Sequence, residues 1–414
     1  MKKITECRCC GNKNIVAVCD LGDQYLTGVF PSEQDMHNIS KGPLRLVKCH
    51  GDYNDVCGLL QLEHSYDLNE MYGENYGYRS GLNLSMVAHL KAKVASILER
   101  SKLSYSDIVL DIGSNDGTTL NFYPNNLKRI GMDPSGEKFA KYYKKEIQLI
   151  PDFFSAAAFQ LIFRDKKAKV VTSFSMFYDL ENPIEFAKEV ATILDCNDGI
   201  WVFEQSYMPL MLDKVSYDNV CHEHLEYYGL AQIIWILKKS GLKIIDVETN
   251  DINGGSFSVI AANLTSSLKV NEKVIADMLA NEFSANLDKL EPYLDFSEKA
   301  KANRTSVINF LQDAAKNGKR VCGLGASTKG NVLLQYCGVT KSYVESIGEV
   351  NPDKFGAVTP GTGIPILAEA TILDSNPDYL LVLPWHFRSF FIKNELYKGR
   401  TLVFPLPKLE VVEV

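Results

Sequence analysis

Two of the seven histidines of this chain stand two residues apart in the segment YDNVCHEHLEYYGL, residues 217–230, with Glu223 between them. A free imidazole has a pKa of about 6.5, so a neutral histidine can take a proton at physiological pH. Either histidine is therefore a candidate general base, and its neighbours, Glu223 included, are candidates to position it. Two alternative roles stay open for the pair. The histidines could share a metal ion, because residues i and i+2 of an extended segment lie on one face, or both rings could be hydrogen-bonded structural groups.

A second set of reactive side chains lies near the start, where six of the ten cysteines fall within the first 57 residues. A tetrahedral zinc site needs four soft ligands, commonly delivered as two pairs on short turns. Cys7 and Cys10 form one pair, and Cys49 and Cys57 form a wider second pair with His50 as a rival ligand. The pattern predicts a structural zinc site, since four protein ligands leave no open position. The alternative is a set of scattered thiols in a small β-rich module.

A strand followed by a glycine turn is predicted for IVLDIGSNDGTTLNFY, residues 108–123, with Gly113 and Gly117 in the turn and a helix from Thr118. The spacing D-x-G-x-x-x-G differs from the G-x-x-x-x-G-K-[ST] loop that cradles ATP. The next run, LKRIGMDPS, predicts a strand that ends before Asp133. An acid in that place could hold ribose hydroxyls at the carboxyl edge of a doubly wound sheet.

The elements that follow continue this alternation of strand and helix. Apolar runs predict strands over 169–174 and 200–204, and a final pair of strands over 242–250 and 256–263. This order predicts a parallel sheet closed by an antiparallel hairpin. Apolar positions also predict an amphipathic helix from Asn83 onward, and the charged stretch 271–317 predicts a pair of connecting helices.

A second strand, glycine turn and helix follow in GKRVCGLGASTKG, with a strand predicted over 320–324 and a helix from about Asn331. A helix that starts behind a glycine turn can bind an anion, and Lys329 adds a positive charge for a phosphate. Close packing of strand against helix is an equal alternative. His386 follows a later apolar run and is expected at the same carboxyl edge.

Composition limits the class of protein. The 414 residues carry a formal charge of -7 with 46% hydrophobic and 23% charged residues, which is typical of a globular protein of two or three domains. No block of Lys and Arg indicates a nucleic-acid partner, and no long apolar run indicates a membrane span. We expect a cytoplasmic monomer or homodimer with free or metal-bound cysteines.

Taken together, the motifs VLDIGSNDGT, CHEHLEYY, INGGSF, GLGASTKG and PGTGIPI follow the cysteine-bearing start in that order. In this combination the chain resembles the S-adenosylmethionine-dependent C-methyltransferases of nucleotide-linked deoxysugars over nearly all of its length. The resemblance implies an α/β fold with a class I methyltransferase (Rossmann-like) core, a zinc-binding module and a C-terminal Rossmann-like domain. The expected divisions are 1–65 for the zinc module, 66–265 for the methyltransferase domain, 266–317 for a helical connector and 318–414 for the C-terminal substrate-binding domain.

The resemblance also implies a reaction. A base removes the proton beside the ketone of a nucleotide-linked 4-keto-6-deoxy sugar, and the enolate then takes the methyl group. An O- or N-methyltransferase on a nucleotide-linked or phosphorylated sugar-like acceptor is the alternative, and a non-enzymatic binding module with the same fold is a third possibility.

The residues expected to carry this chemistry are these. The resemblance implies that Asp111, Gly113 and Asp133 hold the cofactor, with Ser114, Asn115, Pro134, Asp152, Phe153 and Ser173 as further candidates. His224 is implied as the base, with Glu223, His222 and Tyr76 beside it. Tyr78, Arg79, Lys329, Lys354 and His386 are candidates for the acceptor.

Three positions near the expected site depart from the family pattern. Cys221 stands where many members carry a tyrosine. Tyr178 and Asn253 stand where many carry a histidine. These departures favour the alternative acceptor.

Overall fold

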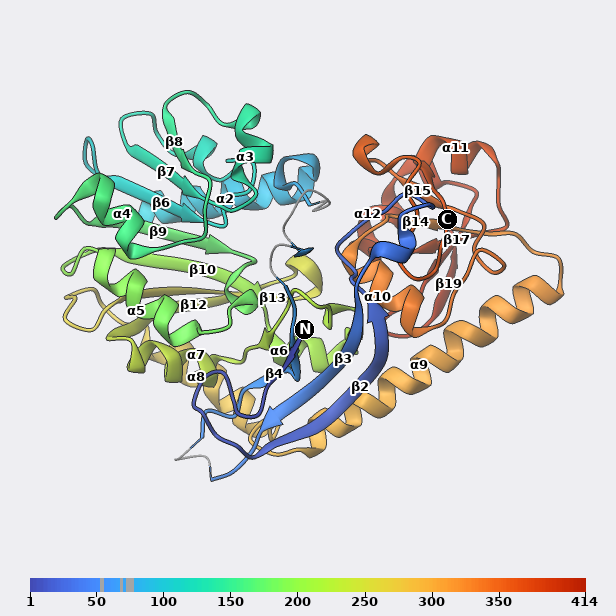
Figure 1. Ribbon diagram of the computed structural model, residues 1–414, viewed down its shortest axis with the longest axis horizontal. Helices are drawn as coiled ribbons and strands as arrows, with labels where there is room; N and C mark the ends of the chain where they lie inside the picture. The colour runs from blue at the N-terminus through green and yellow to red at the C-terminus, as the bar shows by residue number, and fades with distance from the viewer. Residues whose placement is uncertain (53–55, 68–69, 72–77) are drawn as a thin grey trace.

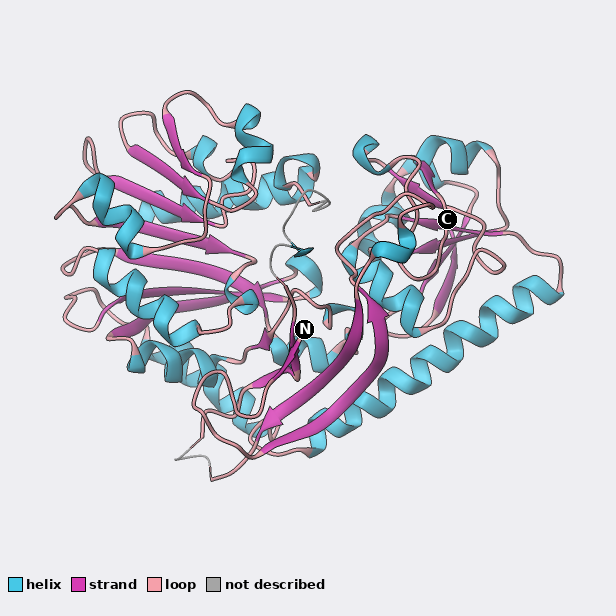
Figure 2. Cartoon of the chain, in the orientation of Figure 1, coloured by secondary structure: helices cyan, strands magenta, loops and turns pink. Residues whose placement is uncertain are grey.

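The computed structural model describes residues 1–52, 56–67, 70–71 and 78–414. Two α/β lobes lie side by side, and a long antiparallel hairpin near the start of the chain runs between them (Figure 1). In both lobes the strands form the centre and helices cover them (Figure 2). The segment 72–77, with the predicted site residue Tyr76, lies outside the described residues.

The first lobe is built on a seven-stranded sheet in the order β12-β13-β10-β9-β6-β7-β8. Its strands are β6 (Ile108–Ile112), β7 (Lys128–Met132), β8 (Ile147–Ile150), β9 (Ala168–Phe174), β10 (Ile200–Ser206), β12 (Leu242–Asn250) and β13 (Ser256–Asn263). Only β13 runs antiparallel to its neighbours β10 and β12. All five residues of β6 are buried, as the unbroken apolar run of a central parallel strand predicts. The predicted parallel sheet with a closing hairpin is confirmed.

Helices cover both faces of this sheet. They are α2 (Leu84–Arg100), α3 (Gly136–Phe139), α4 (Ala156–Phe163), α5 (Pro183–Ile193), α6 (Met208–Asp213) and α7 (Leu230–Lys239). The predicted start of α2 at Asn83 is off by one residue, because the Asn83 side chain caps the helix and accepts from two backbone amides. The helix predicted from Thr118 is wrong. Only a 3-10 turn, Leu120–Phe122, forms there, because Pro124 disfavours helical backbone at the residue before it.

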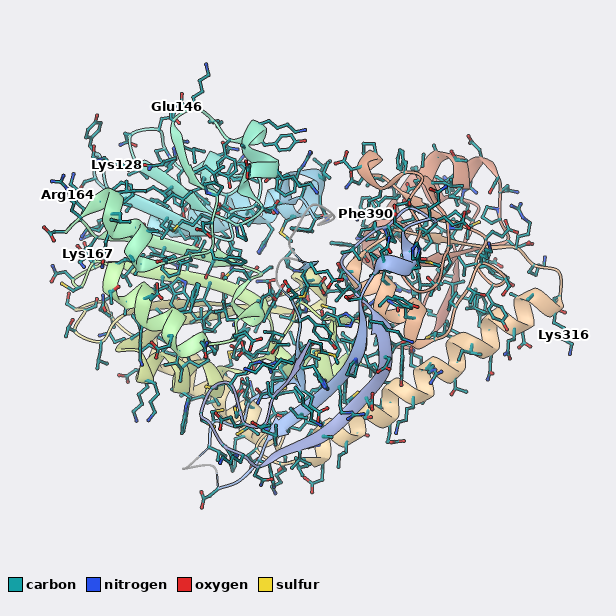
Figure 3. The ribbon with its side chains drawn as sticks, viewed as in Figure 1. Lys128, Glu146, Arg164, Lys167, Lys316 and Phe390 are labelled. Atoms are coloured by element: carbon teal, nitrogen blue, oxygen red, sulfur yellow. The ribbon has the colours of Figure 1, made fainter. Side chains whose placement is uncertain are left out.

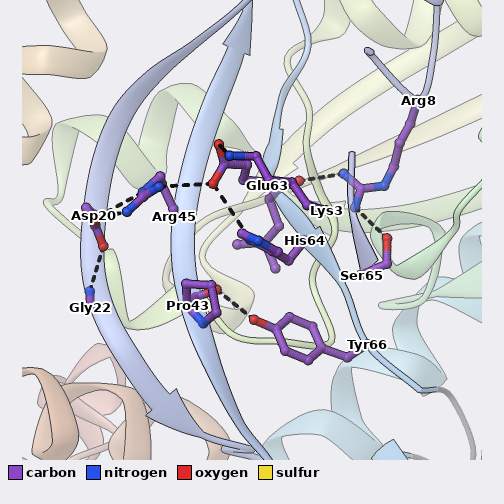
Figure 4. A network of polar contacts seen from close by, with 11 residues as sticks. Lys3, Arg8, Asp20, Gly22, Pro43, Arg45, Glu63, His64, Ser65 and Tyr66 are labelled. Atoms are coloured by element: carbon purple, nitrogen blue, oxygen red, sulfur yellow. Dashed lines mark hydrogen bonds and ion pairs between the residues drawn. The ribbon is translucent and has the colours of Figure 1, made fainter. Parts of the chain in front are cut away.

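The N-terminal segment forms a sheet in the order β11-β4-β3-β2. Its strands are β2 (Ile15–Tyr25), β3 (Lys41–Cys49), β4 (Leu60–Leu62) and β11 (Glu226–Tyr227), and β1 (Lys2–Lys3) pairs with β5 (His64–Ser65) beside it. β11 comes from the segment just after the two histidines, so the cysteine-bearing segment and the first lobe share one sheet. Arg45 joins the strands by contacts of 2.8 Å to Asp20 and 3.2 Å to Glu63 (Figure 4).

The second lobe has a six-stranded sheet in the order β16-β15-β14-β17-β18-β19, parallel except for β19. Its elements are β14 (Val321–Leu324), α10 (Thr328–Tyr336), β15 (Ile347–Glu349), β16 (Ile366–Ala368), α11 (Glu369–Asp374), β17 (Tyr379–Val382), α12 (Arg388–Lys393), β18 (Thr401–Phe404) and β19 (Glu410–Glu413). Helix α10 begins three residues before the predicted Asn331, because the Ser327 side chain caps it by accepting from the amide of Gly330. Lys329 therefore lies in the first turn of the helix.

Two helices connect the lobes, as predicted for this stretch. They are α8 (Glu272–Ser284) and α9 (Glu291–Lys316). Helix α9 packs against β2 and runs along the second lobe, with Lys316 at its far end (Figure 3). Within the described part of the chain, no helix has the length and apolar character that a membrane crossing requires.

Candidate active site and zinc centre

The four predicted zinc ligands lie together. The Sγ atoms of Cys7, Cys10, Cys49 and Cys57 are all within 4.8 Å of one another, and two of the pairs are 3.5 Å apart. Zinc–sulfur bonds of about 2.3 Å in a tetrahedron place the sulfur atoms roughly 3.8 Å apart, so this cluster fits a zinc ion. His50 does not belong to the cluster, and its prediction as a rival ligand is wrong.

A buried lysine accompanies the four cysteines. Lys48 is only 1% exposed, and its ammonium donates to the carbonyl of Gly58 at 2.6 Å, directly after Cys57. Four thiolates around a divalent ion carry an excess of negative charge, which a buried ammonium offsets. The amide of the Asn12 side chain also donates to the Sγ of Cys49 at 3.3 Å. Neither partner could be predicted from the spacing of the cysteines.

The glycine loop lies at the carboxyl edge of β6. Gly113 and Gly117 have φ values of +71° and +73°, which side chains disfavour. The Ser114 hydroxyl lies 2.8 Å from the phenol oxygen of Tyr143, so this side chain holds the loop against the sheet. The Asn115 side chain accepts from the amide of Ser80 and thereby fixes the segment that lies over the loop.

Two acids lie under and beside this loop. The carboxylate of Asp133, one residue beyond β7, accepts from the amide of Asn115 at 2.8 Å and from the amide and hydroxyl of Ser135. A carboxylate has about four acceptor positions, so the contacts among the described residues leave one for a ribose hydroxyl. Asp111 lies deeper and accepts from Thr172 at 2.5 Å, and burial raises its pKa to about 7. Asp111 therefore supports the loop from below.

The remaining candidates for the cofactor divide into two groups. Pro134, Asp152 and Phe153 follow β7 and β8 at the same edge, and the Phe153 ring is 45% exposed, which suits an aromatic face that a flat ligand could cover. Ser173 is a wrong prediction for a side-chain contact. It is fully buried within β9, and its hydroxyl accepts from the indole of Trp201 at 2.9 Å.

Tyr78 and Arg79, predicted for the acceptor, lie instead over the glycine loop. The backbone carbonyl of Tyr78 accepts from the Asn115 side chain at 3.2 Å. The Arg79 guanidinium is 3.6 Å from the carboxylate of Asp116 and 4.2 Å from the ring centre of Tyr142. These contacts place Arg79 with the cofactor side of the lobe.

His224 is held in one tautomer. Its Nδ1 lies 2.9 Å from the backbone carbonyl oxygen of Asn219, which can only accept, so Nδ1 carries the proton and Nε2 of the neutral ring carries none. Burial and the nearby charge of Lys329 lower the pKa of His224 to about 3. The Tyr178 ring lies against the imidazole with a centroid distance of 4.1 Å. His224 is thus a neutral imidazole with an unprotonated Nε2.

His222 does not assist His224, and that prediction is wrong. The amide of His224 bonds to the carbonyl of Cys221, so the segment turns and the two histidines do not share a face. His222 is fully buried, and its ring meets Tyr66 edge-on at 4.6 Å. The Tyr66 hydroxyl in turn donates to the carbonyl of Pro43 (Figure 4). The same geometry removes the metal alternative for the pair.

Glu223 faces the loop that follows β2. A Cβ atom at Gly28 would lie 1.9 Å from a carboxylate oxygen of Glu223, so the Glu223 side chain lies directly against the backbone of Gly28. The hydroxyl of Thr27 is 3.5 Å from the same carboxylate, and burial raises the pKa of Glu223 above its ordinary value. The prediction that Glu223 orients the imidazole is therefore wrong, since the Asn219 carbonyl does this. Gly28 and Asn219 could not be found from the sequence, because their roles depend on contacts across the fold.

The second lobe brings two of its predicted residues, Lys329 and His386, to this region. The Lys329 ammonium donates to the carbonyl of Asn253 at 2.7 Å. His386 packs near Gly254, beside Asn253. Lys354 lies on the other side of the glycine turn of this lobe, where it donates to the carbonyl of Ala326 at 2.8 Å. The residues from 217 to 224 thus meet both the N-terminal hairpin and the second lobe.

Comparison with known proteins agrees with this arrangement. Three family models match consecutive parts of the chain: "Putative zinc binding domain" over residues 7–72, "Methyltransferase domain" over 86–247 and "C-methyltransferase C-terminal domain" over 251–407. The chain is an S-adenosylmethionine-dependent methyltransferase with the domain set of the C-methyltransferases. The resemblance seen in the sequence is confirmed for the zinc-binding, methyltransferase and C-methyltransferase C-terminal domains.

One relative matches over the full length. The C-methyltransferase NovU of Streptomyces niveus is 28% identical over 418 residues, which cover 100% of this chain and 98% of NovU. Among solved structures, an S-adenosylmethionine-dependent methyltransferase from Clostridium acetobutylicum shares 14% identity over 43% of this chain and 92% of its own, with a TM-score of 0.33. The plantazolicin methyltransferase BpumL in complex with SAH shares 14% identity over 42% of this chain and 82% of its own, also with a TM-score of 0.33. At these scores the two structures add nothing to the assignment.

The zinc centre is tested by replacing one ligand. We expect Cys10→Ser to lose the roughly one zinc per chain that the purified protein holds, because three thiolates bind the ion far less tightly than four. Cys9→Ser is the matched control, since Cys9 lies between the two ligands but outside the cluster. Metal content is measured by mass spectrometry after gel filtration. Full zinc in the Cys10 variant would remove this residue from the site.

The cofactor site is tested at Asp133. Asp133→Asn should weaken S-adenosylmethionine binding by about 1.5–3 kcal/mol, the scale of a lost hydrogen bond to a charged group. Asp165→Asn, an exposed carboxylate just ahead of β9, should leave binding unchanged. Isothermal titration calorimetry measures both, with thermal unfolding to verify the fold. An unaltered dissociation constant for the Asp133 variant would mean that another group holds the ribose.

The buried His222 makes stability depend on pH. Burial lowers its pKa from the ordinary value to about 4, so below about pH 6.5 the unfolded chain takes up a proton that the folded chain refuses. The free energy of unfolding should thus fall as the pH drops, by about 2 kcal/mol at pH 5 from this group alone. His222→Phe should lose this part of the pH dependence in urea unfolding, whereas the exposed His37→Gln should keep it. If the free energy of unfolding fell equally steeply with pH in His222→Phe and in the wild type, His222 would not be the group responsible.

Proposed function

We propose that this methyltransferase acts on carbon, at the position beside the ketone of a nucleotide-linked 4-keto-6-deoxy sugar. The observation that carries the proposal is the tautomer of His224, whose Nδ1 is tied to the Asn219 carbonyl and whose Nε2 is free to take a proton. Carbon beside a ketone must lose a proton before it can attack a methyl donor. The full-length similarity to a C-methyltransferase supports the same reaction.

Each group of residues has a separate role in the proposed reaction. Bound S-adenosylmethionine supplies an electrophilic methyl group. Asp133 and the Gly113 loop hold it at the edge of the first lobe, with Asp152 and Phe153 beside them. His224 takes the proton of the acceptor through Nε2. Lys354 and His386 of the second lobe bind the acceptor and Lys329 faces its reacting end, while Tyr78 and Arg79 cover the cofactor.

We also propose that the predicted divisions at residues 65, 265 and 317 separate functional parts. The shared sheet of β4 and β11 supports a zinc module that fixes the catalytic segment rather than one that acts by itself. A cytoplasmic monomer or homodimer agrees with the ten unpaired cysteines, which need a reducing environment to stay free or metal-bound.

A second acceptor class has one observation in its favour. Tyr178 lies directly against His224, and Cys221 is fully buried, where burial raises its thiol pKa well above the ordinary value. These two positions differ from the family pattern and border the base. An acceptor hydroxyl or amine on a nucleotide-linked sugar would need the same base but no enolate.

His224→Asn tests the proposed base. The amide keeps approximate size but cannot take a proton, so turnover of a thymidine diphosphate 4-keto-6-deoxyhexose should fall by roughly two to four orders of magnitude. S-adenosylmethionine binding should stay unchanged, and the exposed His37→Asn should be fully active. In D2O without methyl donor, the wild type should exchange the proton beside the ketone, and His224→Asn should not.

Two outcomes would contradict the proposal. Methyl transfer without any exchange of that proton would favour the O- or N-methyltransferase. Normal exchange in His224→Asn would show that a different group is the base. Mass spectrometry and proton NMR of the recovered nucleotide sugar separate the two results.

A further inference from the structure

The side chain of Lys329 reaches out of its own lobe. Helix α10, which carries it, packs against the 3-10 turn η6 (Tyr217–Asn219) of the first lobe. Its ammonium donates to the Asn253 carbonyl at 2.7 Å, and Asn253 belongs to the loop between β12 and β13. The ammonium therefore lies among residues of the methyltransferase lobe, on a helix that packs against the turn whose Asn219 carbonyl orients His224.

Asp218 is a buried carboxylate in η6, at the junction where α10 of the second lobe packs against the first lobe. It is 1% exposed, and its Oδ2 accepts from the indole of Trp385 at 2.8 Å. Within the described residues its Oδ1 has no hydrogen-bond partner. A buried carboxylate with a free oxygen is costly unless a positive charge lies near it. Lys329 supplies that charge, since the carboxylate and the ammonium each counter the effect of burial on the pKa of the other.

The junction resists a second positive charge. Burial and the charge of Lys329 together lower the pKa of His224 and that of His386. A proton on His224 would therefore place an imidazolium near an ammonium, and both side chains are partly shielded from water. Proton transfer to His224 becomes favourable when a negative charge forms between the two groups at the same moment.

We propose that Lys329 is a catalytic residue whose ammonium pairs with the enolate oxygen, and that Asp218 is the positioning residue that holds it in place. In this step the carbon–hydrogen bond beside the ketone breaks, and the proton goes to Nε2 of His224. The electron pair forms a carbon–carbon double bond, and the carbonyl π electrons move to oxygen, where the ammonium faces the new charge. This assignment rests on the proposed function.

The assignment changes the prediction that Lys329 binds phosphate. Lys354 is better placed for that part of the acceptor, because its ammonium donates to the carbonyl of Ala326 in the glycine turn itself. Its side chain also lies 4.2 Å from the ring centre of Phe30, next to the loop of Thr27 and Gly28. The two lysines thus have different partners, Lys329 in the loop between β12 and β13 and Lys354 in the glycine turn and beside Phe30.

The test separates a role in proton removal from a role in binding. Deuterium exchange beside the ketone of a thymidine diphosphate 4-keto-6-deoxyhexose is followed by NMR without methyl donor, over a range of substrate concentrations. Lys329→Met should lower the maximal exchange rate by roughly 10²–10³-fold, with a KM within about threefold of the wild type. Lys329→Arg should recover part of the rate. The exposed Lys341→Met is the control and should behave as the wild type.

Asp218→Asn keeps an acceptor for the Trp385 indole but removes the charge. We expect it to lower the maximal exchange rate by about tenfold while S-adenosylmethionine binding stays unchanged. In Lys329→Met the imidazole of His224 should titrate at higher pH than in the wild type, because a neighbouring positive charge is gone. Histidine NMR measures this independently of substrate.

Distinct results would overturn the assignment. A raised KM with a normal maximal rate in Lys329→Met would make Lys329 a binding residue only, and an unshifted His224 titration would show that the two groups are too far apart. A wild type that transfers methyl groups but exchanges no proton would instead overturn the proposed function itself, and the enolate role with it. If Lys329→Met is insoluble, Lys329→Arg and Asp218→Asn are measured instead. A lowered maximal exchange rate with an unchanged KM supports the assignment, and a raised KM with a normal rate contradicts it.

Discussion

The hydrogen bond from His224 Nδ1 to the Asn219 carbonyl is the contact on which the site depends. One neutral imidazole has two tautomers, and only this one leaves Nε2 unprotonated. The carbonyl is fixed because η6 is clamped on two sides. The Tyr217 hydroxyl donates to Asn303 of α9 at 2.8 Å, and the Tyr217 ring meets Tyr336 of α10 at 5.1 Å. The orientation of one side chain in the first lobe thus requires the connector and the second lobe.

The same dependence explains why the N-terminal hairpin crosses between the lobes. Gln335 of α10 exchanges two hydrogen bonds with the backbone of Tyr25 at the end of β2, and Asn331 donates to the carbonyl of Thr27. Gly28 then fits against the Glu223 carboxylate. Zinc at the far end of this hairpin would tie Cys49 at the end of β3 to Cys57 shortly before β4, and β4 pairs with β11 just after His224. The metal centre and the base are thus linked through one sheet.

Much of the fold could be predicted from the sequence because its signals are local. The buried run of β6, the glycine turn after it and the paired cysteines each report their own conformation within a few residues. Side-chain directions in the irregular segment 217–224 could not be predicted in this way. The alternative of a shared metal ion needed His222 and His224 on one face, but a turn separates them. Distant residues such as Tyr66 and Asn219 decide where each ring points. The prediction that Ser173 contacts the cofactor was wrong for a related reason. Side chains alternate between the two faces of strand β9, and the Ser173 hydroxyl points to the face where the Trp201 indole lies.

A crystal structure with S-adenosylhomocysteine and a thymidine diphosphate 4-keto-6-deoxyhexose tests the role of His224 most directly. C-methylation by this base predicts that the carbon beside the ketone lies within about 3.5 Å of His224 Nε2, as proton transfer requires. The Nδ1 bond to Asn219 should be unchanged, and the ketone oxygen should face the ammonium of Lys329. A sugar bound with its ketone turned away from His224, or with a hydroxyl or amine in that place, would contradict C-methylation by this base.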